Sequence, residues 1–357
     1  IMERVKEIIP FLEYDAEPYI VISGGKLYWM MDAYTTSGRY PYSQLFENSL
    51  NYIRNAAKVV VDAYSGTVTF YIADPDDPII QTYNKIFPGV FQPLSAMSAD
   101  LRAHVRYPQD LFKIQIGIFA AYHMTIPQVF YNKEDLWDLP KVSTNNTEVA
   151  MEPYYMVMRL PGETQAEYIL MQPYTPTNKD NMIAWLAARS DGENYSKLVV
   201  YRFPKDKLVY GPKQIEARID QDDYISQQFT LWGQRGSEII RGNLTIIPIK
   251  ESLLYVEPIY LQAERGKIPE LKRVLVASND QLVMEETLES AIQSLFSGIS
   301  KTRITSTVIN TGQVDLSVQD KLKRAWEHFQ RAKEFQQKNN WSGYGEELQQ
   351  VEKYLKQ

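Results

Sequence analysis

Residues 19–35 read YIVISGGKLYWMMDAYT, and this stretch predicts a β-hairpin. Apolar and β-branched residues fill Tyr19–Ile22 and Leu27–Thr35, and the turn residues Ser23-Gly24-Gly25 separate the two runs. Glycine readily adopts the positive φ angles that a tight hairpin turn needs, so the chain is expected to reverse its direction there.

The same pattern of strand-like runs around turn residues recurs along the chain. Further hairpins are predicted for Lys58–Ala63 with Thr67–Ile72, Tyr155–Leu160 with Glu167–Gln172, Leu244–Ile249 with Leu253–Leu261, and Arg273–Ala277 with Gln281–Met284. Met182–Arg189 is ambiguous, because its alanines favour a helix while the turn residues and valines that follow favour a hairpin. We interpret it as a strand.

Helices are predicted between these hairpins. Pro108 suits a first helical turn, and apolar side chains recur at helical spacing from there to His123. Shorter helices are expected from Asp222 or Asp223 through Trp232 and from Thr287 to Phe296. Successive hairpins with interspersed helices favour an α+β fold with mostly antiparallel sheets.

The domain organisation follows from changes in pattern. We expect an α+β subdomain with two N-terminal hairpins at 1–150, a second α+β subdomain at 151–297, a linker at 298–316 and a helical hairpin at 317–357. The helical hairpin repeats apolar residues at intervals of three and four, which predicts one adhesive face. Residues expected on that interaction face are Trp326, Phe329, Trp341, Tyr344 and Leu348.

The composition excludes several classes of protein. The 357 residues include no cysteine, so disulfide scaffolds, cysteine-ligated zinc and thiol nucleophiles are excluded. With 38 basic and 44 acidic residues and no basic cluster, nucleic acid is not an expected partner. The longest apolar stretch, from Ile114 to about Pro127, falls short of the roughly 18 residues of a membrane span. Because the chain begins Ile1-Met2, we interpret it as a piece of a longer protein.

Several motifs carry a resemblance to a known family. They include Asn51-Tyr52-Ile53-Arg54-Asn55, Val61-Asp62-Ala63-Tyr64-Ser65-Gly66, Leu101-Arg102-Ala103-His104-Val105-Arg106-Tyr107-Pro108 and Tyr255-Val256-Glu257-Pro258-Ile259-Tyr260. In order and spacing they resemble an uncharacterised protein family (UPF) of large bacterial integral membrane proteins. The resemblance implies about seven N-terminal membrane spans followed by a large soluble region outside the cytoplasmic membrane, of which this chain is most. It implies no established activity, cofactor or catalytic residue.

Arg102, His104 and Arg106 form one candidate site. On a helix the two arginines would share a face and could hold a phosphate, sulfate or carboxylate, whereas an extended segment would align all three side chains. The alternative is that the arginines form structural ion pairs with neighbouring carboxylates. The chain has only three histidines, with none at the spacing typical of zinc sites, so a catalytic zinc ion is not expected.

Asp74, Asp76 and Asp77 form a second candidate site. Three carboxylates within four residues could bind a hard cation such as calcium, although the glycine and terminal glutamate of an EF-hand loop are missing. The alternative is a turn that leads into a helix beginning at Pro78.

No acid, base, metal or nucleophile constellation is evident, so a binding or interaction module without a cofactor is the first functional hypothesis. Its expected partners are the membrane segments of the full-length protein, an envelope component, another protein or a second copy. One alternative is an enzyme that processes envelope polysaccharide or a phosphorylated lipid. Another is a sensor or regulatory domain of a transporter.

Overall fold

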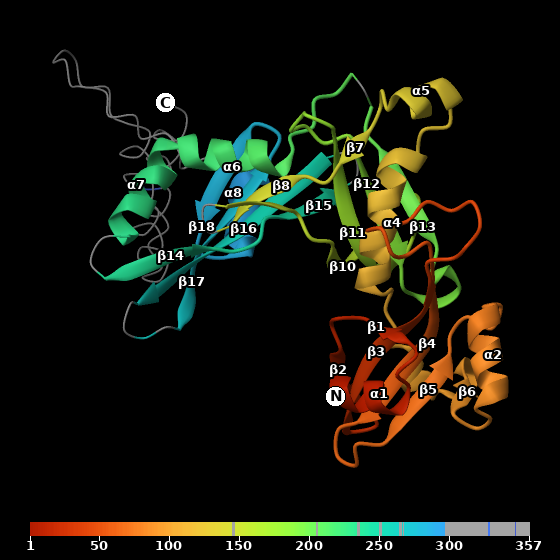
Figure 1. Ribbon diagram of the computed structural model, residues 1–357. Helices are drawn as coiled ribbons and strands as arrows, with labels where there is room; N and C mark the ends of the chain where they lie inside the picture. The colour runs from red at the N-terminus through yellow and green to blue at the C-terminus, as the bar shows by residue number, and fades with distance from the viewer. Residues whose placement is uncertain are drawn as a thin grey trace. The chain divides into compact units, whose positions relative to one another are not determined.

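The computed structural model describes residues 1–144, 147–204, 206–233, 236–249, 252–263, 266, 268–296, 328 and 347 (Figure 1). The chain divides into two compact units, Ile1–Thr302 and Arg303–Gln357. The predicted helical hairpin and its interaction face lie outside the described residues, apart from His328 and Glu347, which are helical and whose side chains are in contact. The fold described below is that of the first unit.

The first sheet has the strand order β1-β3-β4-β5-β6, with β2 also paired to β3. Its strands are β1 (Glu13–Tyr14), β2 (Tyr19–Ser23), β3 (Lys26–Ser37), β4 (Tyr52–Asp62), β5 (Val68–Ile72) and β6 (Phe91–Pro93). Antiparallel pairing of β2 with β3 confirms the hairpin predicted from residues 19–35. Gly24 and Gly25 both have positive φ, 55° and 75°, as a type I′ turn requires.

Both faces of this sheet are covered. Helices α1 (Met2–Ile8) and α2 (Pro78–Ile86) pack on one face, where Met31, Val59 and Phe70 are buried. The 3-10 helix η1 (Leu94–Ala96) and α3 (Ala99–Arg102) lie on the other, against Met30 and Val60. Successive residues of β3 and β4 therefore enter different cores, which explains why these strands are apolar without strict alternation.

The second sheet has the order β10-β11-β12-β13, and β7 also pairs with β11. Its strands are β7 (Trp137–Asp138), β10 (Tyr154–Arg159), β11 (Ala166–Pro176), β12 (Ala184–Arg189) and β13 (Leu198–Arg202). Helix α4 (Gln109–Tyr122) packs against it through Phe112 and Ile116. The other connecting elements are α5 (Pro127–Asn132), β8 (Lys141–Thr144), β9 (Thr147–Ala150) and the 3-10 helix η2 (Gly192–Asn194). Every residue of β12 is buried, so burial within the sheet outweighs the helix propensity of its alanines and the predicted strand is confirmed.

The third sheet has the order β14-β16-β17-β18, with β15 also paired to β16. Its strands are β14 (Ser237–Arg241), β15 (Thr245–Ile249), β16 (Ser252–Ala263), β17 (Pro269–Ser278) and β18 (Gln281–Glu285). The helices beside it are α6 (Pro212–Gln221), α7 (Asp223–Trp232) and α8 (Leu288–Phe296). The first two contribute Ile215, Ile219 and Ile225 to one core, and α8 contributes Leu295 to another.

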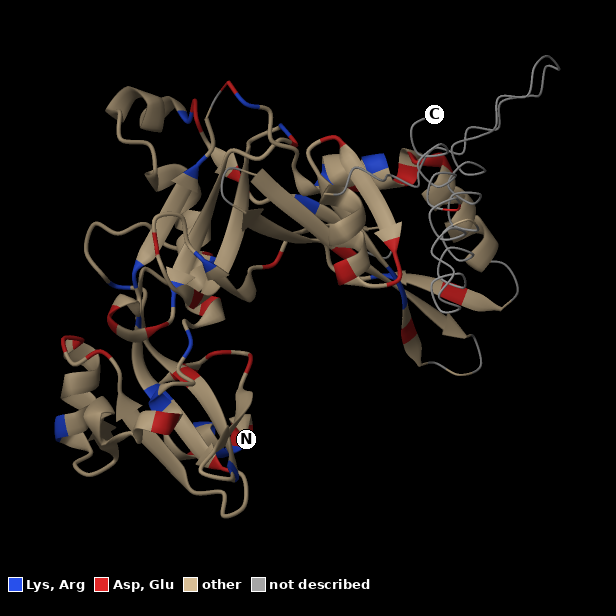
Figure 2. Cartoon of the chain, turned by 180° about the vertical axis from the view of Figure 1, so that it is seen from behind, with Lys and Arg blue, Asp and Glu red and all other residues tan. Residues whose placement is uncertain are grey.

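These elements confirm an α+β fold with mostly antiparallel sheets and interspersed helices. Among the described pairings of the three sheets, β5 with β6 is parallel and the others are antiparallel. Within the described ranges, the helices are too short or too polar to cross a bilayer. Figure 2 shows basic and acidic positions interspersed along the described strands and helices.

Candidate functional site

The structure directs Arg102, His104 and Arg106 to separate partners. Helix α3 ends at Arg102, so the two arginines do not share a helical face. Arg102 Nη2 donates to the Leu94 carbonyl at 2.8 Å, and His104 Nδ1 lies 2.8 Å from the Asp100 carbonyl oxygen. The Arg106 guanidinium carbon lies 3.9 Å from the ring centre of Tyr19. An anion site at these residues stays a prediction.

Asp77 is the N-cap of α2 and is fully buried. Its carboxylate accepts hydrogen bonds from Thr35 Oγ1 and Tyr52 OH, both at 2.6 Å, and from the backbone N–H groups of Ile79 and Ile80. This arrangement is what a turn leading into a helix requires, because the cap satisfies N–H groups that have no partner within the helix.

The neighbouring aspartates have partners of their own. Asp74 accepts from Arg54 Nη1 at 3.3 Å and, through its other oxygen, from the backbone N–H of Asp76 at 3.1 Å. Among the residues that the structure describes, no group of three or more His, Cys, Asp or Glu side chains is placed to hold a metal ion. The cation site at Asp74, Asp76 and Asp77 therefore has no geometric support beyond its spacing.

Sequence reasoning missed a buried ion pair that joins β3 and β4 of the first sheet. Lys58 Nζ contacts Asp32 Oδ1, and the two side chains are 2% and 3% exposed. Asn55 Nδ2 donates to the same carboxylate oxygen at 2.9 Å. Burial alone would lower the pKa of Lys58, but the adjacent Asp32 carboxylate reverses this, so the pKa of the lysine is raised. The Asp32 carboxylate thus favours the charged form of Lys58.

The second sheet closes over this ion pair. Lys58 Nζ lies 5.2 Å from the ring centre of Tyr195, and Tyr155 OH donates to the Tyr107 carbonyl at 2.5 Å. The backbone N–H of Tyr107 donates in turn to Ser190 Oγ at 3.1 Å. Lys58 of the first sheet thus contacts Tyr195, which lies in the connection between β12 and β13.

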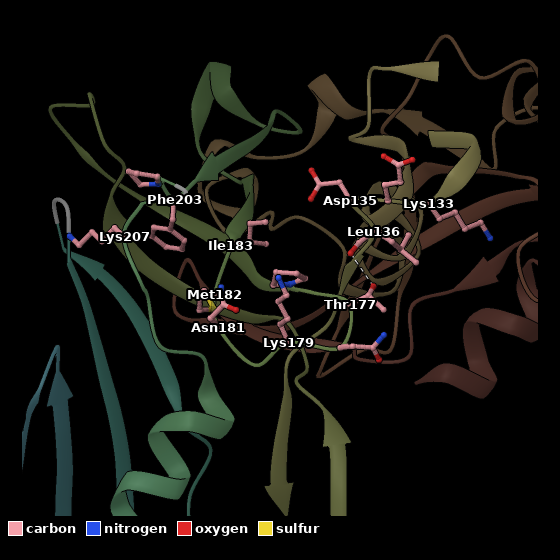
Figure 3. Close-up of a pocket in the computed structure, with 14 residues that line it drawn as sticks. Lys133, Asp135, Leu136, Thr177, Lys179, Asn181, Met182, Ile183, Phe203 and Lys207 are labelled. Carbon is pink, nitrogen blue, oxygen red and sulfur yellow. Dashed lines mark hydrogen bonds between the residues drawn. The ribbon is translucent and has the colours of Figure 1, made fainter. Parts of the chain in front are cut away.

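A pocket of about 480 Å³ lies at one end of the second sheet and is the candidate ligand site (Figure 3). Three parts of the chain line it: 133–136 after α5, 176–179 with 181–183 between β11 and β12, and Phe203, Pro204 and Lys207 after β13. Lys133, in the left-handed region at φ 55°, ends α5 and turns the chain along the pocket. Asn178, at φ 62°, makes the corresponding turn between the strands, a conformation that asparagine tolerates well.

The polar groups of this pocket suit an anionic, hydroxyl-bearing ligand. Figure 3 shows Lys133 and Asp135 on one side, Phe203 and Lys207 on the other, and Lys179 reaching toward the middle. Thr177, Asn178 and Asn181 add hydroxyl and amide groups, which both donate and accept hydrogen bonds.

The acidic side chains of the pocket face cations or amides. Glu134 Oε1 accepts from Asn132 Nδ2 at 2.8 Å, and Asp135 Oδ2 lies 3.6 Å from Arg202 Nη2. In the described part of the chain, neither Lys133 nor Lys179 forms an ion pair. The pocket lining therefore holds three lysines against two carboxylates, a small excess of positive charge.

The rings of a histidine and a tryptophan stack beside Asp135, one of the residues that line the pocket. The rings of His123 and Trp137 lie 3.7 Å apart at 21°, and the His123 side chain is 3% exposed. His123 Nε2 and Trp137 Nε1 are buried without a hydrogen-bond partner among the described residues. Asp135 Oδ2 lies 3.8 Å from His123 Nε2, so the histidine contacts the pocket through this carboxylate.

His123 is expected to make the protein less stable in mild acid. Burial lowers the pKa of His123, although the Phe119 carbonyl and Asp135 oppose this and Arg202 reinforces it. The unfolded chain therefore binds a proton more readily than the folded one, and the free energy of unfolding falls as the pH drops below about 6.5. We expect His123→Phe, which keeps the stacked ring, to reduce this fall between pH 7.5 and 5.5 in urea titrations.

His104→Gln is the matched control, because this histidine bonds a backbone carbonyl at an exposed position. It shows how much of any change comes from replacing a histidine as such. Equal slopes for the wild type and His123→Phe would contradict the assignment.

Comparison with known proteins places the chain among bacterial relatives. A family model described as "Uncharacterised protein family (UPF0182)" matches residues 1–232. A UPF0182 protein of Pelotomaculum thermopropionicum is 54% identical over 358 residues, which cover 99% of this chain and 39% of that protein. One from Geobacter sulfurreducens is 52% identical over 357 residues, covering 99% and 39%. The chain thus spans about 40% of the length of these curated relatives. No solved structure matches it.

Proposed function

This chain belongs to the uncharacterised protein family UPF0182, and we propose that it is a ligand-binding module in a larger bacterial membrane protein. The ligand is a polar, negatively charged component of the cell envelope, and the module lies outside the cytoplasmic membrane. Its permanent partners are the membrane segments of the full-length protein. Support for the larger protein comes from the relatives, which are about two and a half times as long as the matched region.

The pocket at the end of the second sheet carries the binding proposal. Its volume of about 480 Å³ lies within the range of pockets that hold small molecules. Side chains from three segments converge on it, and two of these segments directly follow or connect strands of one sheet. Sites on such a rigid scaffold bind with little reorganisation.

Charge selects the ligand class. Lys179 reaches toward the middle of the pocket and Lys133 stands at its rim (Figure 3). Exposed ammonium groups attract anions such as phosphate and carboxylate, although water and salt weaken each contact to about 0.2–1 kcal/mol. The module therefore binds a single charged group weakly, and neighbouring hydroxyl contacts supply the remaining affinity.

Calorimetric titration with glucuronate and with inorganic phosphate tests the proposal. We expect binding that weakens with added salt and that falls about fivefold in the double variant Lys133→Ala/Lys179→Ala. Lys26→Ala, which removes an exposed lysine from the β2–β3 turn, should bind as the wild type does. Absence of binding by both probes, or equal binding by the double variant, would overturn the proposal.

A further inference from the structure

The candidate pocket is the middle one of three adjoining cavities. A cavity of about 340 Å³ shares Phe203 and Lys207 with it. A smaller cavity of about 130 Å³ shares Pro176, Asn178 and Lys179. The two neighbouring cavities adjoin the central one at different residues, and their linings have no residue in common.

From this arrangement we propose that the three cavities form one groove for a linear oligosaccharide, with a negatively charged sugar in the central cavity. The inference rests on the proposed function and extends it from one charged group to a chain of sugars. A single sugar acid would occupy the central cavity and leave the neighbouring 340 Å³ unused.

The flanking cavities favour uncharged sugar units over a continuous polyanion. Asp280 and Lys207 line the second cavity, and the third is lined by Asp138, Asp180, Lys141, Lys179 and Lys213. A continuous polyanion could pair with the lysines but would be repelled by the carboxylates. Sugar hydroxyls, by contrast, can donate to these carboxylates and accept from the neighbouring lysines.

The second cavity also provides fixed polar and aromatic surfaces. Tyr210 OH donates to Asp280 Oδ1 at 3.2 Å, and the Arg218 guanidinium lies 5.0 Å from the Tyr210 ring centre. Arg218 Nη1 also donates to the Asn279 carbonyl at 2.5 Å. These contacts hold the wall in place before a ligand arrives, which lowers the entropic cost of binding.

Phe203 joins the central and second cavities. Its ring is half-buried and lines both of them. The C–H face of a pyranose ring packs well on an aromatic face, so a sugar chain can pass from one cavity to the next over this side chain. Phe203 is therefore assigned as a positioning residue for the longer ligand.

The test compares glucuronic acid with a hyaluronan tetrasaccharide, which alternates glucuronic acid with N-acetylglucosamine. We expect the tetrasaccharide to bind at least tenfold more tightly than the monomer. In Phe203→Leu, which keeps an apolar side chain in the wall, the ratio of tetrasaccharide affinity to monomer affinity should fall below threefold. Tyr224→Ala removes an exposed aromatic ring that lines none of the three cavities and is the matched control.

The outcomes separate the two proposals. Equal affinity for monomer and tetrasaccharide, or no binding of either while inorganic phosphate still binds, would overturn the groove and leave the binding module standing. No binding of the two sugars or of phosphate would contradict the module itself. A tetraglutamate peptide that binds as tightly as the tetrasaccharide would overturn the carbohydrate assignment. An undiminished advantage in Phe203→Leu would overturn the continuity of the groove at this residue.

Discussion

Asp32→Asn is expected to lower the free energy of unfolding by about 3–5 kcal/mol, because it leaves the buried Lys58 ammonium without its counter-charge. The substitution preserves the size of the side chain and its ability to accept from Asn55, so the loss reports the charge rather than a cavity. Guanidinium denaturation followed by the intrinsic fluorescence of the six tryptophans measures the effect.

A second substitution distinguishes lost charge from damaged packing. Lys58→Met in the Asp32→Asn background removes the stranded ammonium, and we expect it to restore at least half of the lost stability. The control is Glu152→Gln, which breaks the exposed Lys113–Glu152 pair and should change stability by less than about 1 kcal/mol. A change of under about 1 kcal/mol in Asp32→Asn itself would show that the buried pair is dispensable.

Gly211→Ala is the second substitution with a large expected effect. A Cβ atom at this position would lie 1.8 Å from the Asp180 carbonyl oxygen, so the backbone at one of these positions must move. Overpacking of this kind costs about 1–3 kcal/mol and occasionally more. Because Asp180 lies between Lys179 and Asn181, the displacement should also weaken glucuronate binding to the pocket, by about tenfold or more.

Gly117→Ala is the matched control for that prediction. Gly117 lies in α4, and its added Cβ would meet Phe46 Cε2 at an ordinary 3.7 Å. Alanine is a better helix former than glycine, so this variant should be more stable by about 0.5–1 kcal/mol and bind glucuronate normally. Thermal unfolding and calorimetry of the two variants would contradict the prediction if Gly211→Ala matched the wild type in both.

Local patterns predicted most of the hairpins. At the β2–β3 turn and at β12–β13, the signal lies in adjacent residues, so a single stretch of sequence is sufficient. β14 was missed because it pairs with the second half of β16 and not with β15, the strand that follows it along the chain. α6 was missed because its pattern, PKQIEARIDQ, is mainly polar and its N-cap is Gly211 instead of a Ser, Thr, Asp or Asn.

The candidate pocket could not be predicted in the same way. Nothing in the sequence distinguishes Lys133, Lys179 and Lys207 from the other lysines. Their segments come together only when the second sheet has formed. The buried pair does leave a signal in the sequence, because Lys58 interrupts the apolar run AAKVVV within β4. A lysine there must find a partner inside the protein, but sequence does not say that the partner is Asp32.

The contacts at Tyr107 have a consequence for how the first unit unfolds. The backbone N–H of Tyr107 donates to Ser190, which follows β12, and its carbonyl accepts from Tyr155 in β10. Both contacts lie beside the charged pair of the first sheet. Separating the two sheets would leave these groups without hydrogen-bond partners and would expose Lys58 to water. The amide protons of β4 and β12 should therefore exchange with solvent through one shared opening event. A protease that cuts between the two sheets should release neither sheet in a folded form.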